Sequence, residues 1–221
     1  MTAGTSGAHK DRMLFAGSRK PVLTGAWLLV FFAVLAWSAI RPKDYPTWLL
    51  EVAPALAGLV VLVLTRRRFP LTALAYLLVL VHSVILMVGG HYTYAEVPAG
   101  EWLREAFDLG RNDYDKLGHF AQGFVPAILA REVLVRLAVV NGRRWRNVLV
   151  VCVCLAISAV YELIEWLVAL LSAQAAEAFL GTQGYVWDTQ SDMAWALGGA
   201  LLALALLGRY HDRQLARLGS G

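Results

Sequence analysis

Long apolar runs separated by short polar connections fill most of the chain. A helix of about 20 residues crosses the ~30 Å hydrocarbon core of a bilayer, and six of the runs approach or exceed that length. These runs cover residues 22–40, 47–64, 71–88, 114–139, 148–171 and 189–207. The pattern therefore predicts an all-α fold, a polytopic membrane bundle of six transmembrane helices.

Composition excludes a soluble domain. Hydrophobic residues make up 58% of the 221 positions, charged residues make up only 16%, and the mean hydropathy is +0.56, which is too apolar for a soluble protein of this length. The net charge of +4 does not indicate nucleic-acid binding, because Lys and Arg lie at the ends of the apolar runs. We expect one membrane domain over residues 21–210. A flexible cytoplasmic tail at 1–20, without a cleavable signal peptide, and a cytoplasmic tail at 211–221 are expected to flank it.

The distribution of basic residues predicts the orientation of the bundle. Four Lys or Arg residues precede the first run, three lie in each of the connections at 66–68 and 141–146, and three follow Gly208, whereas the connection at 172–188 has none. Because cytoplasmic connections are enriched in basic residues, both termini are predicted to be cytoplasmic. The acidic connection at 89–113 then faces outward. A short helix around Trp102 and Phe107, ending near Gly110, is expected to lie in the membrane interface.

Polar side chains interrupt three of the apolar runs at a similar depth. The residues are Asp115, Lys116, His119 and Gln122 in the fourth run, Glu162 and Glu165 in the fifth, and Asp188, Gln190 and Asp192 at the start of the sixth. Asp115, His119 and Gln122 share one helical face. His119, Glu162 and Asp192 lie 17, 16 and 17 residues from the basic residue at the other end of their helix. At ~1.5 Å per residue, all three are roughly 25 Å from one membrane face, and we interpret them as walls of one polar site opening outward.

Carboxylates outnumber cations in this predicted site. Asp115, Glu162, Glu165, Asp188 and Asp192 are compensated only by Lys116 and His119. An unpaired carboxylate in a low dielectric costs several kcal/mol, so the surplus must be protonated, hydrated or matched by a cation. Ionisable residues inside a membrane are functional candidates, and the alternative is a hydrogen-bonded network that holds three helices in register, with Asp188 and Asp192 capping the sixth.

Three functional interpretations are compatible with these residues. In the first, the site binds a divalent metal, the head group of a lipid-linked or other amphiphilic ligand, or both. The candidate catalytic residues, as acid and base, are Asp115, His119, Glu162, Glu165 and Asp192. The candidate ligand contacts are Lys116, Gln122, Asp188 and Gln190, and the candidate metal ligands are His119, Glu162 and Asp192. His82 offers a further imidazole in the third run.

In the second interpretation the same carboxylates relay protons or bind a coupling cation in a small transporter, although no inverted repeat or broken helix pair stands out. In the third, the protein is a non-enzymatic membrane partner. Whether a reaction is catalysed stays open from the residues alone.

The two cysteines carry no chemistry in any of these interpretations. Cys152 and Cys154 are two positions apart, so on a helix their side chains point about 200° apart, which fits neither a disulfide nor a metal pair. Both are expected to fill the core.

Three motifs carry a family resemblance over most of the chain. They are DKLGHFAQGFVPA at 115–127, YELIEW at 161–166, and FLGTQGYVWDTQSDM at 179–193 followed by Gly198 and Gly199. These segments resemble the YjdF-like family of bacterial inner-membrane proteins, a domain of unknown function. More distantly, the D-K-x-x-H helix start is similar to VanZ-like proteins, which are linked to glycopeptide-antibiotic resistance. The resemblance implies a multi-pass inner-membrane fold and no particular reaction.

Overall fold

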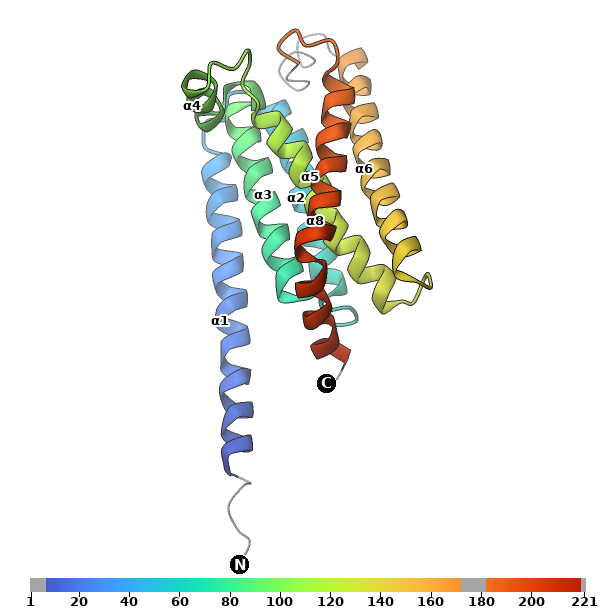
Figure 1. Ribbon diagram of the computed structural model, residues 1–221. Coiled ribbons are helices and arrows are strands. Elements are labelled where there is room, and N and C mark those ends of the chain that lie inside the picture. The colour runs from blue at the N-terminus through green and yellow to red at the C-terminus, as the bar shows by residue number, and fades with distance from the viewer. Residues whose placement is uncertain (1–6, 172–181, 220–221) are drawn as a thin grey trace, which may run out of the picture.

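The computed structural model describes residues 7–171 and 182–219, and every regular element in these ranges is a helix. The helices are α1 (Gly7–Ser38), α2 (Tyr45–Thr65), α3 (Ala73–Tyr92), the 3-10 turn η1 (Tyr94–Glu96), α4 (Pro98–Ala106), α5 (Tyr114–Arg136), α6 (Arg143–Leu171) and α8 (Asp188–Gly219). Figure 1 shows the long helices side by side, with α4 at one end of the bundle and the start of α1 and the end of α8 at the other. We call these the α4 end and the basic end, since Arg66, Arg143 and Arg209 all lie toward the latter.

Within the described residues, four helices are long and apolar enough to cross a membrane: α2, α3, α6 and residues 188–218 of α8. The apolar part of α1, Leu23–Ser38, is shorter. The polytopic helical membrane fold predicted from the apolar runs is therefore confirmed. Most of the predicted connection at 172–188 lies outside the described residues, and α8 continues well past the predicted end of the last run at residue 207.

The short helix predicted in the acidic connection is present as α4. Trp102 and Phe107 are largely exposed beside it, as expected for an apolar face turned toward a membrane interface. The helix ends at Ala106 rather than near Gly110, because the chain turns at Asp108, whose φ of 51° is left-handed.

The centre of the bundle is the crossing of α5 and α8. A Cβ added to Gly123 of α5 would lie 1.7 Å from the carbonyl oxygen of Ala196, and one added to Gly199 of α8 would lie 2.1 Å from that of Phe120. The two backbones therefore touch where only hydrogen stands on the Cα atoms, as in small-residue crossings of membrane helices. Around the crossing lies an apolar core drawn from α3, α5, α6 and α8, which includes Leu74, Ile128, Val150, Cys154 and Ala203.

Only one of the two cysteines belongs to this core. Cys154 is fully buried and its thiol lies 3.5 Å from the carbonyl oxygen of Gly123, whereas Cys152 is exposed. The expectation that both fill the core is wrong for Cys152, because the same angular separation that rules out a disulfide turns this side chain away from α5.

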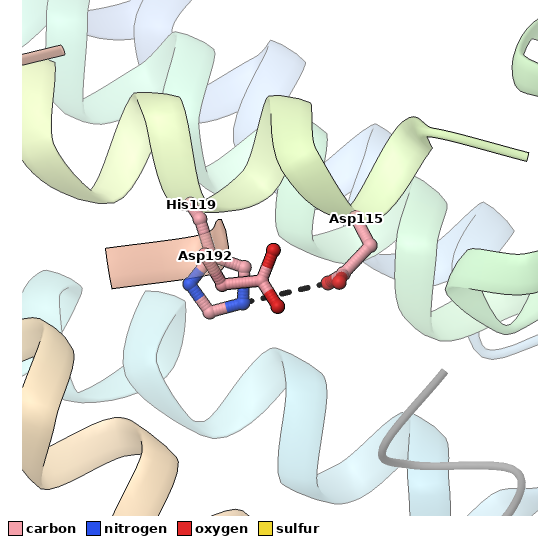
Figure 2. Close-up of side chains that lie close together, drawn as sticks. All are labelled: Asp115, His119 and Asp192. Carbon is pink, nitrogen blue, oxygen red and sulfur yellow. Dashed lines mark ion pairs between the residues drawn. The ribbon is translucent and has the colours of Figure 1, made fainter. Parts of the chain in front are cut away.

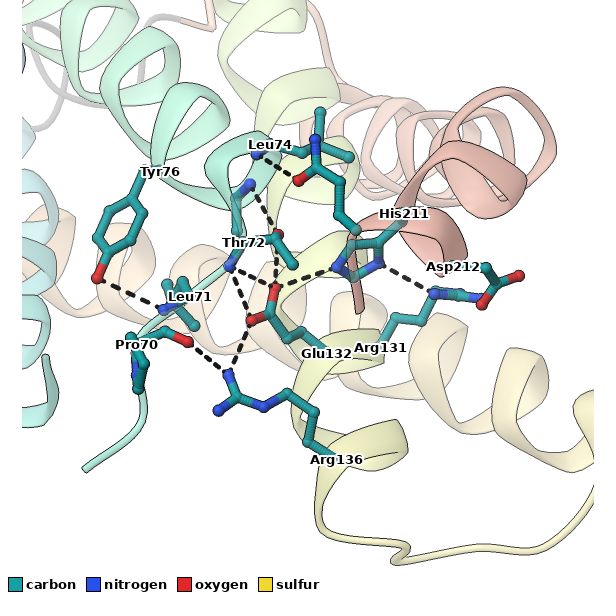
Figure 3. Close-up of polar contacts among 12 residues, drawn as sticks. Pro70, Leu71, Thr72, Leu74, Tyr76, Arg131, Glu132, Arg136, His211 and Asp212 are labelled. Carbon is teal, nitrogen blue, oxygen red and sulfur yellow. Dashed lines mark hydrogen bonds and ion pairs between the residues drawn. The ribbon is translucent and has the colours of Figure 1, made fainter. Parts of the chain in front are cut away.

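A buried polar cluster joins α3, α5 and α8 near the basic end (Figure 3). Glu132 is fully buried and accepts hydrogen bonds from the backbone N–H of Thr72 at 2.9 Å, the Thr72 hydroxyl at 2.7 Å, His211 Nε2 at 3.1 Å and Arg136 Nη1 at 3.0 Å. Thr72 is also the N-cap of α3. One carboxylate thus fixes the start of α3 against two other helices.

The same cluster determines the tautomer of His211. Arg131 Nη1 lies 3.0 Å from His211 Nδ1, and a guanidinium can only donate, so Nδ1 must be the acceptor. The ring hydrogen is then on Nε2 and is donated to Glu132. Arg131 also forms an ion pair with Asp212, which follows His211 in α8. Every polar group of this cluster therefore has a partner of the right kind, which is the condition under which a buried ion pair is tolerated.

The glycine crossing gives a direct stability prediction. Gly199→Ala should reduce the free energy of unfolding by about 1–3 kcal/mol, because the added methyl group would overlap the backbone of α5. The neighbouring Gly198→Ala is the matched control, since a Cβ there meets nothing within 4 Å and alanine favours the helix. Thermal unfolding in detergent measures both. Equal melting temperatures for the two variants would contradict the close crossing.

Candidate functional site

The first turns of α5 carry the polar face that the sequence predicts. Asp115, His119 and Gln122 follow one another at intervals of four and three residues, and all three are buried between α5 and its neighbours. Because a helix completes a turn in 3.6 residues, this spacing stacks the three side chains on one stripe. The prediction of a common face is confirmed.

Asp192 of α8 completes a compact group with two of these residues. Asp115, His119 and Asp192 each offer one donor atom, and the three atoms all lie within 4.8 Å of one another. Figure 2 shows the Asp192 carboxylate beside the same edge of the His119 imidazole from which the ion pair runs to Asp115. We call these residues the Asp–His–Asp cluster. It exists because Asp192 stands one turn before Ala196, which the glycine crossing presses against α5.

Both ring nitrogens of His119 face oxygen atoms. Nε2 lies 3.5 Å from Asp115 Oδ1, while Nδ1 lies 3.2 Å from Gln122 Oε1 and 3.7 Å from Glu162 Oε1. A neutral imidazole donates from only one nitrogen, so the other position requires a second proton or a metal ion. The imidazole is also 6.1 Å from the ring of Tyr161, edge to face.

The grouping differs in one member from the metal set predicted from sequence. His119 and Asp192 are together as predicted, but the third close donor is Asp115, and Glu162 lies at the opposite ring nitrogen. The count of residues along the helices correctly predicted that Glu162 lies near His119. It could not predict which ring nitrogen Glu162 faces, because that depends on the rotation of α6 about its axis.

Several carboxylate oxygens at this site lack hydrogen-bond donors. Among the described residues, Asp115 Oδ2, Glu162 Oε1 and Asp192 Oδ1 are buried without a hydrogen bond. A buried charged oxygen left without a partner costs several kcal/mol. Glu132, by contrast, accepts four hydrogen bonds from its neighbours.

Arg111 is the main cation of the site, and the sequence did not single it out. Its guanidinium pairs with Asp188, lies 3.6 Å from Asp115 and lies 3.5 Å from Asp113. Burial disfavours the charged guanidinium, but the hydrogen bond to Asp188 and the nearby carboxylates outweigh this and raise the pKa of Arg111 above its ordinary value. The residue lies in an acidic connection whose fold could not be inferred from periodicity.

Two predicted ligand contacts are not part of the buried site. Lys116 lies 2.6 Å from Asp113, so it does not compensate the carboxylates facing His119. Gln190 is exposed on α8, because it stands between Asp188 and Asp192 and therefore points away from the face that carries them. Asp188 is buried against Arg111 as described above.

A cavity of about 220 Å³ adjoins the Asp–His–Asp cluster between α2, α3, α5 and α6. Asp115, His119 and Gln122 form one wall, and its other polar walls are Glu51, His82, Tyr94, Tyr161 and Glu165. Glu165 therefore faces this cavity, on the same side as its predicted partners. The sequence analysis did not predict Glu51, because a single acidic residue near the start of a helix has no second polar residue at helical spacing to mark a polar face.

Tyr94 closes the cavity toward the α4 end. Its ring occupies the space that side chains would take at Gly89 of α3 and Gly118 of α5, since a Cβ at either position would lie 2.7–2.8 Å from ring carbons. Burial raises the pKa of the Tyr94 phenol well above its ordinary value, so the hydroxyl stays neutral.

Replacing Arg111 should expose the charge imbalance of the site. Arg111→Gln leaves Asp115 and Asp188 without their cation, and we expect a loss of roughly 3 kcal/mol in unfolding free energy at neutral pH. The loss should shrink as pH falls toward about 4, because protonation removes the carboxylate charges. Thermal unfolding at several pH values measures this. Arg104→Gln, which breaks an exposed pair with Glu101, is the control, and an equal, pH-independent loss in both variants would contradict the assignment.

Comparison with known proteins agrees with this membrane architecture. Residues 23–213 match the family described as "Predicted membrane protein (DUF2238)". The chain is 53% identical over 200 residues to the Inner membrane protein YjdF of Escherichia coli (strain K12), an alignment that covers 90% of this chain and 96% of that protein. No solved structure matches. These findings confirm the resemblance and the inner-membrane location expected from the motifs: the chain belongs to the DUF2238 family and is a multi-pass protein of the bacterial inner membrane.

Proposed function

We propose that the Asp–His–Asp cluster binds a divalent metal ion and that the ion, together with the adjoining cavity, holds the head group of an amphiphilic ligand. The observation that carries the proposal is the set of buried carboxylate oxygens that converge on His119 without hydrogen bonds. Two carboxylates and one imidazole are a donor set suited to Mn²⁺ or Zn²⁺. Small side-chain rotations would bring donor atoms within 4.8 Å of one another around one ion.

The adjoining cavity supports a ligand larger than a metal ion. Its walls combine the polar groups named above with Leu86, Ile157 and two prolines, so a polar head and the start of an apolar chain both find complementary surfaces. In this function Glu162 and Glu165 are the groups placed to accept or donate a proton near the head group.

A second candidate is a small proton- or cation-coupled transporter, and one observation favours it. Pro54 and Pro126 lie inside α2 and α5, and both line the cavity, so two proline-containing helices face the polar site. Ion flux into proteoliposomes that disappears in Asp192→Asn would favour this alternative over a binding or catalytic role.

We also propose that the bundle crosses the membrane six times, with α5 as the fourth span and the cavity on the outer side. α5 is too polar to qualify by hydropathy, yet it runs through the middle of the bundle, where its polar residues are covered by other helices. The basic turns, the start of α1 and the end of α8 gather at the end opposite α4, as cytoplasmic segments would.

Cysteine labelling tests this orientation. In a background of Cys152→Ser and Cys154→Ala, a cysteine at the exposed Ala99 should react with an impermeant thiol reagent added to intact spheroplasts. A cysteine at Asn141 should react only after the membrane is opened. The opposite pattern would reverse the orientation and place the cavity on the cytoplasmic side.

Metal binding is tested by mass action. Mn²⁺ or Zn²⁺ at a hundredfold excess over its dissociation constant should stabilise the purified protein by ~2.7 kcal/mol, and a chelator should reverse the shift. Asp192→Asn should abolish the response, whereas Asp108→Asn, at an exposed position, should keep it. Elemental analysis of the purified protein gives an independent count of bound metal. If no metal co-purifies and neither ion alters the melting temperature, the metal proposal fails.

A further inference from the structure

Two carboxylates in the cavity lie outside the metal cluster and have no cationic partner. Glu51 is 2% exposed and Glu165 is 7% exposed, and neither forms an ion pair within residues 7–171 and 182–219. Arg111 is taken by Asp115, Asp188 and Asp113, and Lys116 is taken by Asp113. Within the described residues, no lysine or arginine pairs with either of these carboxyl groups, and the basic side chains in the cavity wall are the imidazoles of His82 and His119.

The hydrogen bonding of Glu165 is also incomplete. The side chains of Tyr161, at 3.2 Å from Oε2, and Tyr94 both hydrogen-bond to Glu51, but no side chain or backbone N–H in the described part of the chain donates to Glu165. Glu165 is thus a buried polar side chain directed into the cavity without a partner there. Such groups are rare in proteins and point to a bound molecule that supplies the missing donors.

Backbone acceptors add to this surplus. Proline lacks an N–H, so Pro54 cannot bond to the carbonyl of Leu50, nor Pro126 to that of Gln122. A residue and the one four positions earlier share a helix face, so these two carbonyls lie on the sides of α2 and α5 that carry the cavity-lining prolines. The cavity is consequently rich in acceptors and poor in donors.

We infer that this cavity binds a primary ammonium group, held by Glu51 and Glu165 and by carbonyl oxygens freed at the two prolines. An ammonium carries three N–H donors and one positive charge, so it can donate to several of these acceptors and offset one of the two carboxylate charges. This inference rests on the proposed function, because it takes the cavity as the pocket for the head group of the ligand. It does not require that a metal ion is bound. A phosphate alone would face the carboxyl groups of Glu51 and Glu165, which disfavour an anion.

The size and lining of the cavity limit what can carry the ammonium. At about 220 Å³ the cavity has room for roughly seven waters at ~30 Å³ each, which is less than a drug-sized pocket. Leu86 and Ile157 border the polar groups and can cover a short carbon chain attached to the nitrogen. Both a free short amine and the aminoethyl end of a lipid head group have this chemistry.

Ethanolamine is a suitable probe, with ethylene glycol as its uncharged counterpart. Full-length protein in nanodiscs of phosphatidylglycerol should bind ethanolamine in a calorimetric titration and should not bind ethylene glycol. Glu51→Gln should weaken ethanolamine binding at least tenfold, while Glu105→Gln, on the exposed side of α4, should leave it unchanged. Should Glu51→Gln fail to fold, Glu165→Gln serves the same purpose.

Two further arms separate the source of the amine and the role of the metal. If a lipid supplies the ammonium, nanodiscs containing phosphatidylethanolamine should compete with free ethanolamine; unchanged affinity would support a free amine as the ligand. Asp192→Asn should lose the response to Mn²⁺ and keep ethanolamine binding. A protein that binds ethanolamine but does not respond to Mn²⁺ or Zn²⁺ would sustain this inference while the metal proposal fails. Equal binding of ethanolamine and ethylene glycol, or no binding of either, would overturn the ammonium assignment.

Discussion

The close contact between α5 and α8 is the constraint on which the rest of the structure depends. Gly123 and Gly199 let the two backbones touch, and both buried polar clusters take residues from this pair of helices. Toward the α4 end, the contact brings Asp192 to Asp115 and His119. Toward the basic end, it brings His211 to Glu132. A slightly wider spacing would separate both sets, because each depends on short side chains reaching across one interface.

The two polar sets differ in how completely their groups are hydrogen-bonded, and this difference distinguishes a structural cluster from a functional one. Around Glu132, each acceptor meets a donor and the tautomer of His211 follows from its neighbours. Around His119, carboxylate oxygens stay without donors in the described part of the chain, and a cavity lies beside them. A protein gains nothing in stability from burying unpaired carboxylates. Their presence is explained if binding a ligand, rather than holding helices together, is what the site does.

Periodicity predicted those parts of the molecule that are set within a single helix. The apolar runs located the helices, and the spacing of Asp115, His119 and Gln122 located one wall of the site. Arg111 and Tyr94 escaped because they lie in irregular segments, where position depends on contacts such as the paired hydrogen bonds between Asn112 and Gln183. Glu51 was not predicted for another reason. The face of α2 that turns toward the cavity is set by packing against the neighbouring helices, which a single sequence does not reveal.

The length of α8 has a practical consequence for producing the protein. Its last turns look like a dispensable hydrophilic extension, yet Gln214 accepts a hydrogen bond from the backbone of Leu74 at 3.0 Å, and His211 is completely buried. Truncating the chain after the last apolar run would therefore remove the only imidazole from the cluster around Glu132 and uncap the first turn of α3. Affinity tags and fusion partners belong beyond Gly219, behind a flexible spacer, so that the C-terminal helix can still seat against its neighbours.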